Sequence, residues 1–395
     1  MFSPALPIQP TGRLADAAAE LGKSAGNSCG LRWQTFSRGE LEHGLDLWSQ
    51  LEDRLGEQGS SCSTAWIDCW LQHYGDRIAH HLLAASQGGI VRGMALLTTG
   101  VGQKLGPFGV QSMHLGTAGE PLGESVVVEY NRPLVEPGFE TEFRRGLLEH
   151  LRCDLSWEQL RLDGVEEQDL AEWQRLLPGS EVRWRESRYF DLAGLPQGTG
   201  VLPALGSSTR SNLRRRLKAY PDLQADWVPP AEVKSAFAEL VQLHQARWEA
   251  VGQPGAFAAR RFAAFQHDLV TRLVRSQRGE LFRVRSHGTT LGCLFLLNDR
   301  GRLLDYLSGF ASFQEHPGIG LLTHYLCMEA AHAKEYAAYD FLVGDKQHKQ
   351  NLSNAVSRLG WLTWTRPGWK SRCVSGLRAA KRMFGQLRRR VGGGT

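Results

Sequence analysis

A short glycine-containing turn is the feature of this sequence best suited to hold a charged ligand. It reads His316-Pro317-Gly318-Ile319-Gly320 and leads into an amphipathic helical pattern. Backbone N–H groups are free at a helix N-terminus, and the helix dipole favours an anion there. We predict that a cofactor phosphate binds at Gly318, Ile319, Gly320, Leu321 and Leu322. An ordinary strand-to-helix turn is the alternative.

Two carboxylates interrupt apolar segments near this turn. Asp305 lies within Leu303–Ser308 and Asp340 within Tyr339–Val343, and both segments have the composition of buried strands. An unpaired carboxylate is costly in such a place, so each must face a pocket or pair with an arginine. We predict Asp340, Asp305 and His316 as the catalytic residues, one of them acting as a general base.

Basic residues gather at a predicted helix over 211–220. Its compact polar group consists of Arg210, Asn212, Arg214 and Arg215. The planar guanidinium fork of arginine suits a carboxylate or a phosphate. We predict that these residues contact the substrate. A solvated helix face is the alternative.

The elements that must position these residues form a β-α-β unit. A strand at 303–308 precedes the glycine turn, a helix at 319–333 follows it, and a second strand occupies 339–343. The apolar residues of that helix recur with the period of a helix packed on a sheet. An antiparallel meander at 281–308 comes first, with turns suited to hairpins. Together these segments predict an α+β fold with a mixed sheet.

The order of helices, antiparallel strands and a final β-α-β unit occurs twice, which indicates two domains. At 395 residues the chain is long for a single core. A Gly- and Pro-rich segment between the halves has the composition of a linker. The predicted divisions are a disordered lead at 1–30, a first domain at 31–193, a linker at 194–205, a catalytic second domain at 206–365 and a basic amphipathic tail at 366–395.

The net charge of +5 is concentrated at the C-terminal end. Residues 366–395 hold nine Lys or Arg and no Asp or Glu, and removing these nine charges leaves −4 for the rest of the chain. A basic amphipathic helix there predicts peripheral contact with an anionic membrane surface. Because the basic residues are local and no recognition motif accompanies them, we expect no nucleic-acid partner.

The cysteine pattern is that of a reduced, cytoplasmic protein. The seven cysteines include no C-x-x-C pair, so we expect neither a disulfide framework nor a zinc cluster, and no metal cofactor. No apolar run is long enough for a transmembrane helix. The first residues lack the basic start and apolar core of a signal peptide.

Several segments resemble the CelD/BioF-like branch of the GNAT acetyltransferase superfamily, which is related to the tandem-domain Fem aminoacyltransferases. The segments that carry the resemblance are Ser208–Arg215, Leu243–Trp248 followed by Gly252–Gly255, Pro317–Leu322, and Asp340–Leu342 followed by Gly344, Asp345 and Lys349. Two segments of the first half, Trp70–Gly75 and Glu129–Leu134, also fit the pattern. The similarity thus spans Trp33 to Thr365.

The resemblance implies a tandem GNAT-like fold and an enzyme that moves an acyl group, in the simplest case acetyl, from coenzyme A to an amine. The glycine turn would bind the acyl-CoA, and a main-chain N–H within Leu307–Phe310 would polarise the thioester. Trp248 and Lys349 would join the arginine group at the acceptor cleft, although Trp248 also suits the core. The acceptor implied is a small molecule or a precursor of the envelope or of a polysaccharide.

Two other functions stay open on the sequence alone. An aminoacyl-tRNA donor would fit the relationship to Fem proteins, but the second half has no long coiled-coil insertion. A non-catalytic binding protein on a degenerate GNAT scaffold would fit two departures from the family pattern. Glu315 stands where the loop usually begins with Arg or Gln, and His348 replaces the usual tyrosine.

Overall fold

The computed structural model describes residues 30–373 except 101–103, 122, 154–156 and 197. The predicted lead up to residue 29 and the predicted basic tail beyond Cys373 therefore lie outside the described residues. No described helix is both long and apolar enough to cross a lipid bilayer.

Thirteen of the described strands form one mixed sheet, which confirms the predicted fold class. The strand order is β1-β2-β3-β6-β8-β15-β9-β14-β13-β12-β11-β10, with β7 paired to β3. The strands are β1 (Arg32–Phe36), β2 (His80–Gln87), β3 (Ile90–Gly100), β6 (Ser112–Leu115), β7 (Leu134–Val135), β8 (Gln159–Glu166), β9 (Glu181–Asp191), β10 (Gln224–Trp227), β11 (Gly279–Ser286), β12 (Thr289–Asp299), β13 (Arg302–Phe310), β14 (Ala338–Val343) and β15 (Ala355–Thr365). A separate hairpin joins β4 (Lys104–Leu105) to β5 (Phe108–Gly109).

Helices cover both faces of this sheet. The described helices are α2 (Leu41–Leu55), α3 (Thr64–Tyr74), α4 (Glu140–Cys153), α5 (Glu167–Leu176), α6 (Val201–Ala204), α7 (Ser207–Ala219), α8 (Val233–Glu249), α9 (Arg260–Arg275), α10 (Ile319–Ala333) and α11 (Gln347–Leu352). Successive residues of β12 show the two faces, since Phe295 packs in the core under α8 and Leu296 in the core under α10.

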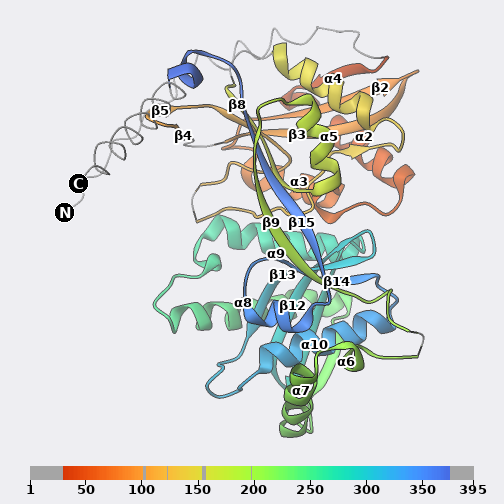
Figure 1. Cartoon of the computed structure of the whole chain (residues 1–395), viewed down its shortest axis with the longest axis vertical. Helices are drawn as coiled ribbons and strands as arrows, with labels where there is room; N and C mark the ends of the chain where they lie inside the picture. The colour runs from red at the N-terminus through yellow and green to blue at the C-terminus, as the bar shows by residue number, and fades with distance from the viewer. Residues whose placement is uncertain (1–29, 101–103, 122, 154–156, 197, 374–395) are drawn as a thin grey trace, which may run out of the picture.

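Two long strands connect the halves of the molecule (Figure 1). β9 ends the first half of the sequence but pairs with β14 of the second, whereas β15 returns to pair with β8 of the first. β9 and β15 also pair with each other, from Ala355 opposite Tyr189 to Thr363 opposite Glu181. The halves thus exchange strands, and the sheet is continuous across them.

The predicted linker at 194–205 contains structure of its own. It includes the short helix α6, and Val201 and Leu205 are buried. One hydrophobic core also spans both halves, because Trp66 of α3 lies 6.0 Å from Phe265 of α9 and 5.8 Å from Tyr306 of β13 between ring centroids. The predicted division into separate domains stays a prediction.

The β-α-β unit expected around the glycine turn is present. β13 and β14 are parallel, and α10 lies between them in sequence. Gly318 is the residue that precedes α10, and its φ of +79° lies in the left-handed region that favours glycine. The turn at the start of α10 therefore depends on this glycine.

Candidate functional site

β13 and β14 are paired only at their first residues. The pairing joins Arg302–Leu304 to Ala338–Asp340, and beyond it the two strands separate. We call the opening between Asp305–Phe310 and Phe341–Val343 the fork. β13 remains paired to β12 on its other side, so within the described residues its edge toward the fork has no strand partner.

Asp340 lies at the base of the fork and is fully buried. Its carboxylate accepts hydrogen bonds from the hydroxyls of Tyr130 (2.5 Å) and Ser187 (2.7 Å), both from the first half. It also accepts bonds from the guanidinium of Arg302 (3.0 Å) and the backbone N–H of Leu342 (2.7 Å). Burial raises the pKa of Asp340 against the effect of these donors. The carboxylate has no solvent-exposed surface, and its catalytic role stays a prediction.

The end of β14 is bent away from β13 by the same group of contacts. Leu342 has a φ of +59°, a left-handed conformation that is rare for a bulky residue. Its N–H is bound by Asp340, and the Lys349 ammonium donates to the carbonyls of Phe341 (2.5 Å), Leu342 (3.0 Å) and Val343 (3.0 Å). Lys349, predicted to bind substrate, therefore holds the bend that opens the fork.

Asp305 is the first residue of β13 beyond the paired segment. Its side chain is 10% exposed, and one carboxylate oxygen is buried without a hydrogen-bond partner. The other oxygen lies 3.9 Å from Nδ1 of His324. Burial raises the pKa of Asp305 to about 6, while the nearby charge of Lys349 lowers it. Asp305 is thus a carboxylate at the mouth of the fork that lacks a full set of partners.

Two histidines next to Asp305 do not supply a positive charge at neutral pH. The rings of His324 and His348 are stacked, with centroids 5.4 Å apart. Burial lowers the pKa of His324 to about 3 and that of His348 to about 4. The sequence position that departs from the family pattern, His348, therefore packs inside the site as a neutral ring.

Glu129 belongs to the site but was absent from the sequence prediction. It reaches from the first half, and its carboxylate accepts a hydrogen bond from the backbone N–H of Val343 (2.8 Å). Burial raises the pKa of Glu129 to about 7, with Lys349 again acting to lower it. A signal was present in the sequence, because this acid closes the apolar run Val126–Val128.

The α10 turn carries an arginine that sequence reasoning also missed. Arg216 of α7 donates to the carbonyl of Pro317 and, through Nε, to the side-chain oxygen of Asn212 (3.0 Å). A Cβ at Gly318 would lie 2.3 Å from the guanidinium carbon, so only glycine admits this contact. His316, which was predicted to be catalytic, belongs to the same turn, and its ring centroid lies 6.2 Å from that of Tyr220.

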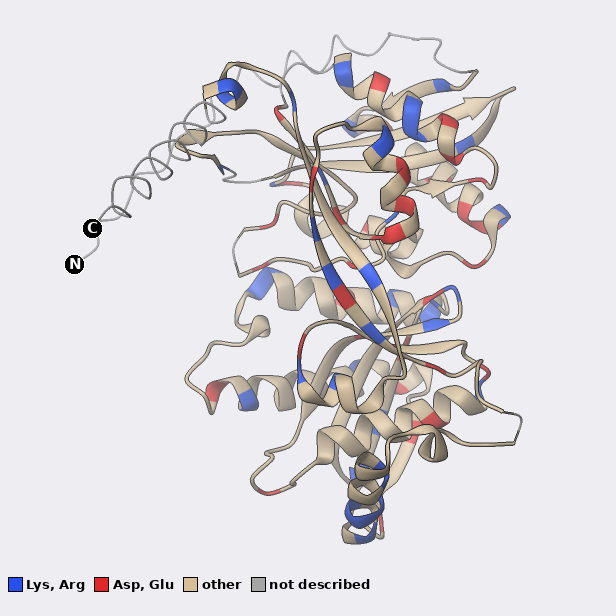
Figure 2. Cartoon of the chain, in the orientation of Figure 1, with Lys and Arg blue, Asp and Glu red and all other residues tan. Residues whose placement is uncertain are grey.

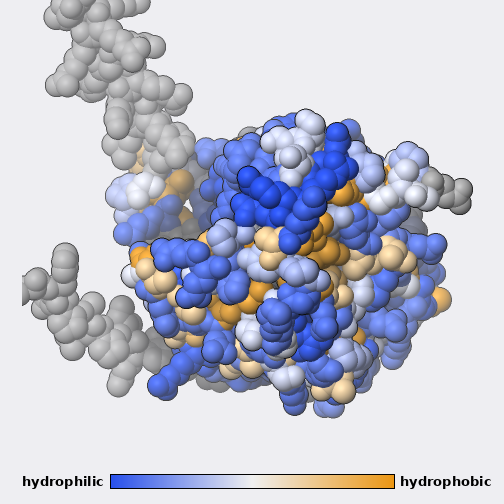
Figure 3. Space-filling model, turned by 90° about the horizontal axis from the view of Figure 1, so that it is seen from below, coloured by the Kyte–Doolittle hydropathy of each residue, from blue (hydrophilic) through white to orange (hydrophobic). Residues whose placement is uncertain are grey.

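The remaining predicted substrate residues are dispersed. Arg210 donates to the carbonyls of Pro203 (3.1 Å) and Leu205 (2.5 Å) and so braces α6, whereas Arg214 is exposed. Arg215 donates to Asn212 (3.1 Å). Basic residues crowd α7 at one end of the molecule (Figure 2), where the surface seen from below is mainly hydrophilic with apolar side chains between (Figure 3).

Trp248 lies at the surface near the end of α8. Its side chain is 43% exposed, so the alternative of a core position is wrong. The indole N–H donates to Nε2 of His244 at 3.0 Å. Its predicted contact with substrate stays a prediction.

Comparisons with known proteins agree with this architecture. Residues 207–350 match the model of a family described as acetyltransferase (GNAT) domain, which confirms the resemblance seen in the sequence. The structure of FemX is similar over 84% of this chain and 97% of its own, with 13% identity and a TM-score of 0.54. No curated protein matches the chain in sequence.

Two further structures share the fold. L-PGS from Bacillus licheniformis is similar over 86% of this chain and 96% of its own, with 11% identity and a TM-score of 0.51. The C-terminal domain of a lysylphosphatidylglycerol synthetase from Agrobacterium fabrum is similar over the same shares, 86% and 96%, with 10% identity and a TM-score of 0.52. At such identities the likeness concerns the fold alone.

Replacing Asp340 tests whether its contacts are structural. Asp340→Asn leaves the Arg302 guanidinium without its buried partner, so we expect a loss of about 3–5 kcal/mol in the free energy of unfolding, measured with urea. Ser357→Ala removes a 2.9 Å hydrogen bond to Tyr130 and a long one of 3.5 Å to the carbonyl of Ser187, and it should cost about 1 kcal/mol. A variant of Asp340 that keeps full stability but loses activity would instead support the catalytic role.

The pH dependence of stability tests the environment of Asp305. Its pKa of about 6 in the folded protein exceeds the ordinary 3.8, so its contribution to stability is full below pH 3.8 and is lost as the pH rises through 6. Ionisation of Asp305 at pH 8 thus lowers the free energy of unfolding by about 3 kcal/mol. We expect Asp305→Asn to have the higher free energy of unfolding at pH 8 and a flatter profile between pH 4 and 7. Exposed Asp345→Asn is the control, and equal profiles for both variants would contradict the assignment.

Proposed function

Because residues 207–350 of this chain belong to the acetyltransferase (GNAT) domain family, we propose that the protein transfers an acyl group from coenzyme A to an amine. The observation that carries the proposal is the fork. Within the described residues, the edge of β13 that faces the fork has no strand partner. It leads from the carboxylates of Asp305 and Glu129 toward the N-terminus of α10, next to Arg216. This arrangement offers a place for an extended ligand with a phosphate at one end.

The donor phosphates bind at the α10 turn in this proposal. Within the described residues, the backbone N–H groups of Gly320 and Leu321 have no acceptor. The Arg216 guanidinium lies beside them through its contact with Pro317. Helix N–H groups and an arginine together suit a pyrophosphate. Arg216 thereby supplies the positive charge that the loop lacks, because Glu315 stands where the family usually has Arg or Gln.

The pantetheine arm of the donor follows the free edge of β13. An extended amide chain can pair with an exposed strand edge as a further strand would. The thioester then lies in the fork, where a backbone N–H of Leu307–Phe310 polarises its carbonyl oxygen. Arg247, whose guanidinium carbon lies 4.6 Å from the centre of the Phe313 ring, flanks the path to the α10 turn.

Glu129 accepts the proton in the chemical step. The amine nitrogen attacks the thioester carbonyl, the C–S bond breaks, and the sulfur leaves as the thiolate of coenzyme A. The proton released by the amine passes to the carboxylate of Glu129, whose pKa of about 7 suits a base at neutral pH. The ammonium of Lys349 lowers the pKa of Glu129 and also that of Asp305. The acceptor is an amine, either of a small molecule or of a precursor of the envelope or of a polysaccharide. It enters beside the first-half segment that carries Glu129.

Calorimetry with acetyl-CoA tests donor binding. Arg216→Ala removes a charge-assisted hydrogen bond worth about 1.5 kcal/mol or more, so we expect Kd to rise about tenfold or more. Gly318→Glu places a negative charge at the turn and should abolish binding. Lys218→Ala, which removes an exposed cation from the same helix, is the matched control and should bind as the unaltered protein does.

The same titration separates the other functions. Failure of the unaltered protein to bind any acyl-CoA would overturn the proposal and favour a non-catalytic scaffold. Binding of aminoacyl-tRNA without binding of acyl-CoA would favour the donor suggested by the Fem relationship.

Glu129→Gln tests the base. Glutamine can still accept the hydrogen bond from Val343 but cannot take a proton, so kcat should fall by about 10²–10⁴-fold with little change in the Kd for acetyl-CoA. The acid limb of the pH profile of kcat/KM, with an apparent pKa near 7 in the unaltered protein, should disappear. Release of coenzyme A thiol with a panel of amines is the assay. Exposed Glu57→Gln is the control, and an unchanged acid limb in Glu129→Gln would rule this base out.

A further inference from the structure

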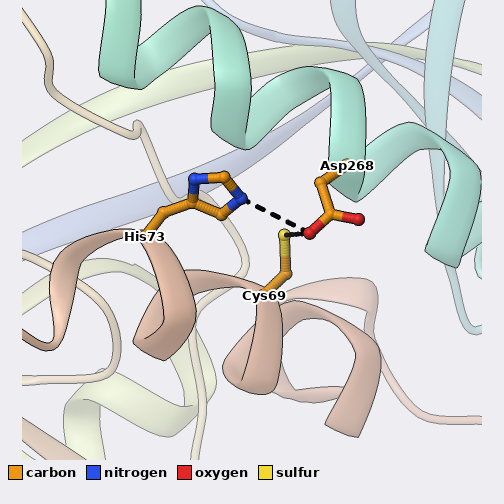
Figure 4. Close-up of side chains that lie close together, drawn as sticks. All are labelled: Cys69, His73 and Asp268. Atoms are coloured by element: carbon orange, nitrogen blue, oxygen red, sulfur yellow. Dashed lines mark hydrogen bonds and ion pairs between the residues drawn. The ribbon is translucent and has the colours of Figure 1, made fainter.

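Three side chains of metal-binding type meet where α3 of the first half packs against α9 of the second (Figure 4). Cys69 and His73 are one helical turn apart on α3, and Asp268 faces them from α9. Sγ of Cys69 lies 3.7 Å and Nε2 of His73 lies 3.4 Å from the same oxygen, Oδ2 of Asp268. All three donor atoms lie within 4.8 Å of one another.

These separations match the edges of a zinc coordination shell. Zinc binds thiolate sulfur at about 2.3 Å and imidazole nitrogen or carboxylate oxygen at about 2.0–2.1 Å, so tetrahedral ligands lie about 3.3–3.6 Å apart. The distances from Asp268 to Cys69 and to His73 already approach these values. Cysteine, histidine and aspartate are also the donors that zinc selects.

Arg272 and Asp68 are the charged groups that contact or share a partner with Asp268. Arg272 orients Asp268 through its Nε (3.0 Å to Oδ1) and its terminal nitrogen (2.9 Å to Oδ2), and it also pairs with Asp68 at 2.6 Å. Two carboxylates and one guanidinium sum to a formal charge of −1. A divalent ion that replaces the thiol proton of Cys69 brings this sum to zero.

The site is reachable from solvent. The side chains of His73 and Asp268 are 22% and 36% exposed. His73 also lines an open cavity of about 490 Å³ beside α3 and α9, which Arg77, Arg260 and Arg261 border as well. An ion and the water that completes its coordination thus have a path to the donors.

We propose that Cys69, His73 and Asp268 bind a zinc ion that clamps α3 of the first half to α9 of the second. Two protein ligands come from one half and one from the other, so the ion stabilises the direct contact between α3 and α9. Binding forms a zinc–sulfur bond and releases the thiol proton to solvent. The proposal departs from the sequence expectation of no metal, which stays a prediction.

Zinc and cobalt binding to the full-length protein test the proposal. We expect about one tightly held zinc ion per chain after removal of free metal, and a zinc-dependent rise in the thermal unfolding midpoint. Cobalt should give the near-ultraviolet charge-transfer absorption of a metal–thiolate bond. Cys69→Ser should lose that absorption, and Asp268→Asn should lose the zinc-dependent rise in midpoint.

Two further variants keep the test decisive. His73→Gln alters a partly exposed ligand and tests the site if substitution of buried Cys69 impairs folding. Cys153→Ser removes an exposed thiol elsewhere and should bind both metals as the unaltered protein does. No cobalt–thiolate band in the unaltered protein, or equal zinc binding by the unaltered protein and His73→Gln, would overturn the proposal and leave a hydrogen-bonded buried thiol.

Discussion

The buried carboxylate of Asp340 is the interaction on which the geometry of this protein depends. One of its oxygens binds the N–H of Leu342, two residues further along β14, and so fixes the left-handed bend at which β14 leaves β13. The other oxygen is held by Tyr130 and by Arg302. Without the bend the parallel pair would continue, and a closed ladder would stand where the fork opens. The Asp340 carboxylate that fixes the fork is thus stabilised by donors from both halves of the chain.

The proposed reaction centre is assembled from groups that cost folding energy. Asp305 and Glu129 are both buried enough for their pKa values to lie well above the ordinary range. Among the described residues, no ion pair with a guanidinium is found for either of them, and the ammonium of Lys349, which lowers both pKa values, is bound to the carbonyls of β14. Carboxylates placed for stability alone would be paired or exposed. Partial desolvation of these two carboxylates costs stability, but it raises their pKa values, as a site that takes up a proton requires.

Local patterns predicted the elements around the fork but not the contacts that unite it. The apolar composition of β13 and β14, the glycine turn and the period of α10 are all local signals, and each element occurs where expected. By contrast, α11 is six residues long and β10 only four, which is too short for a periodic signal. Asp340 was singled out as an acid in an apolar strand, yet its partner Tyr130 is 210 residues away. Pairing over such a separation leaves no trace in a single sequence, and the contacts of Glu129 with Val343 and of Arg216 with Pro317 are equally distant pairings.

The exchange of β9 and β15 has a consequence for how the chain is made. β9 leaves the ribosome early, but its partners β14 and β15 belong to the last part of the described chain. Domains usually fold one after another during synthesis. Here the middle of the sheet stays incomplete until β14 and β15 have been made, and such distant pairings fold slowly. The Asp340 carboxylate can bind Tyr130 and Ser187 only after β14 has been made, so the fork forms late in synthesis.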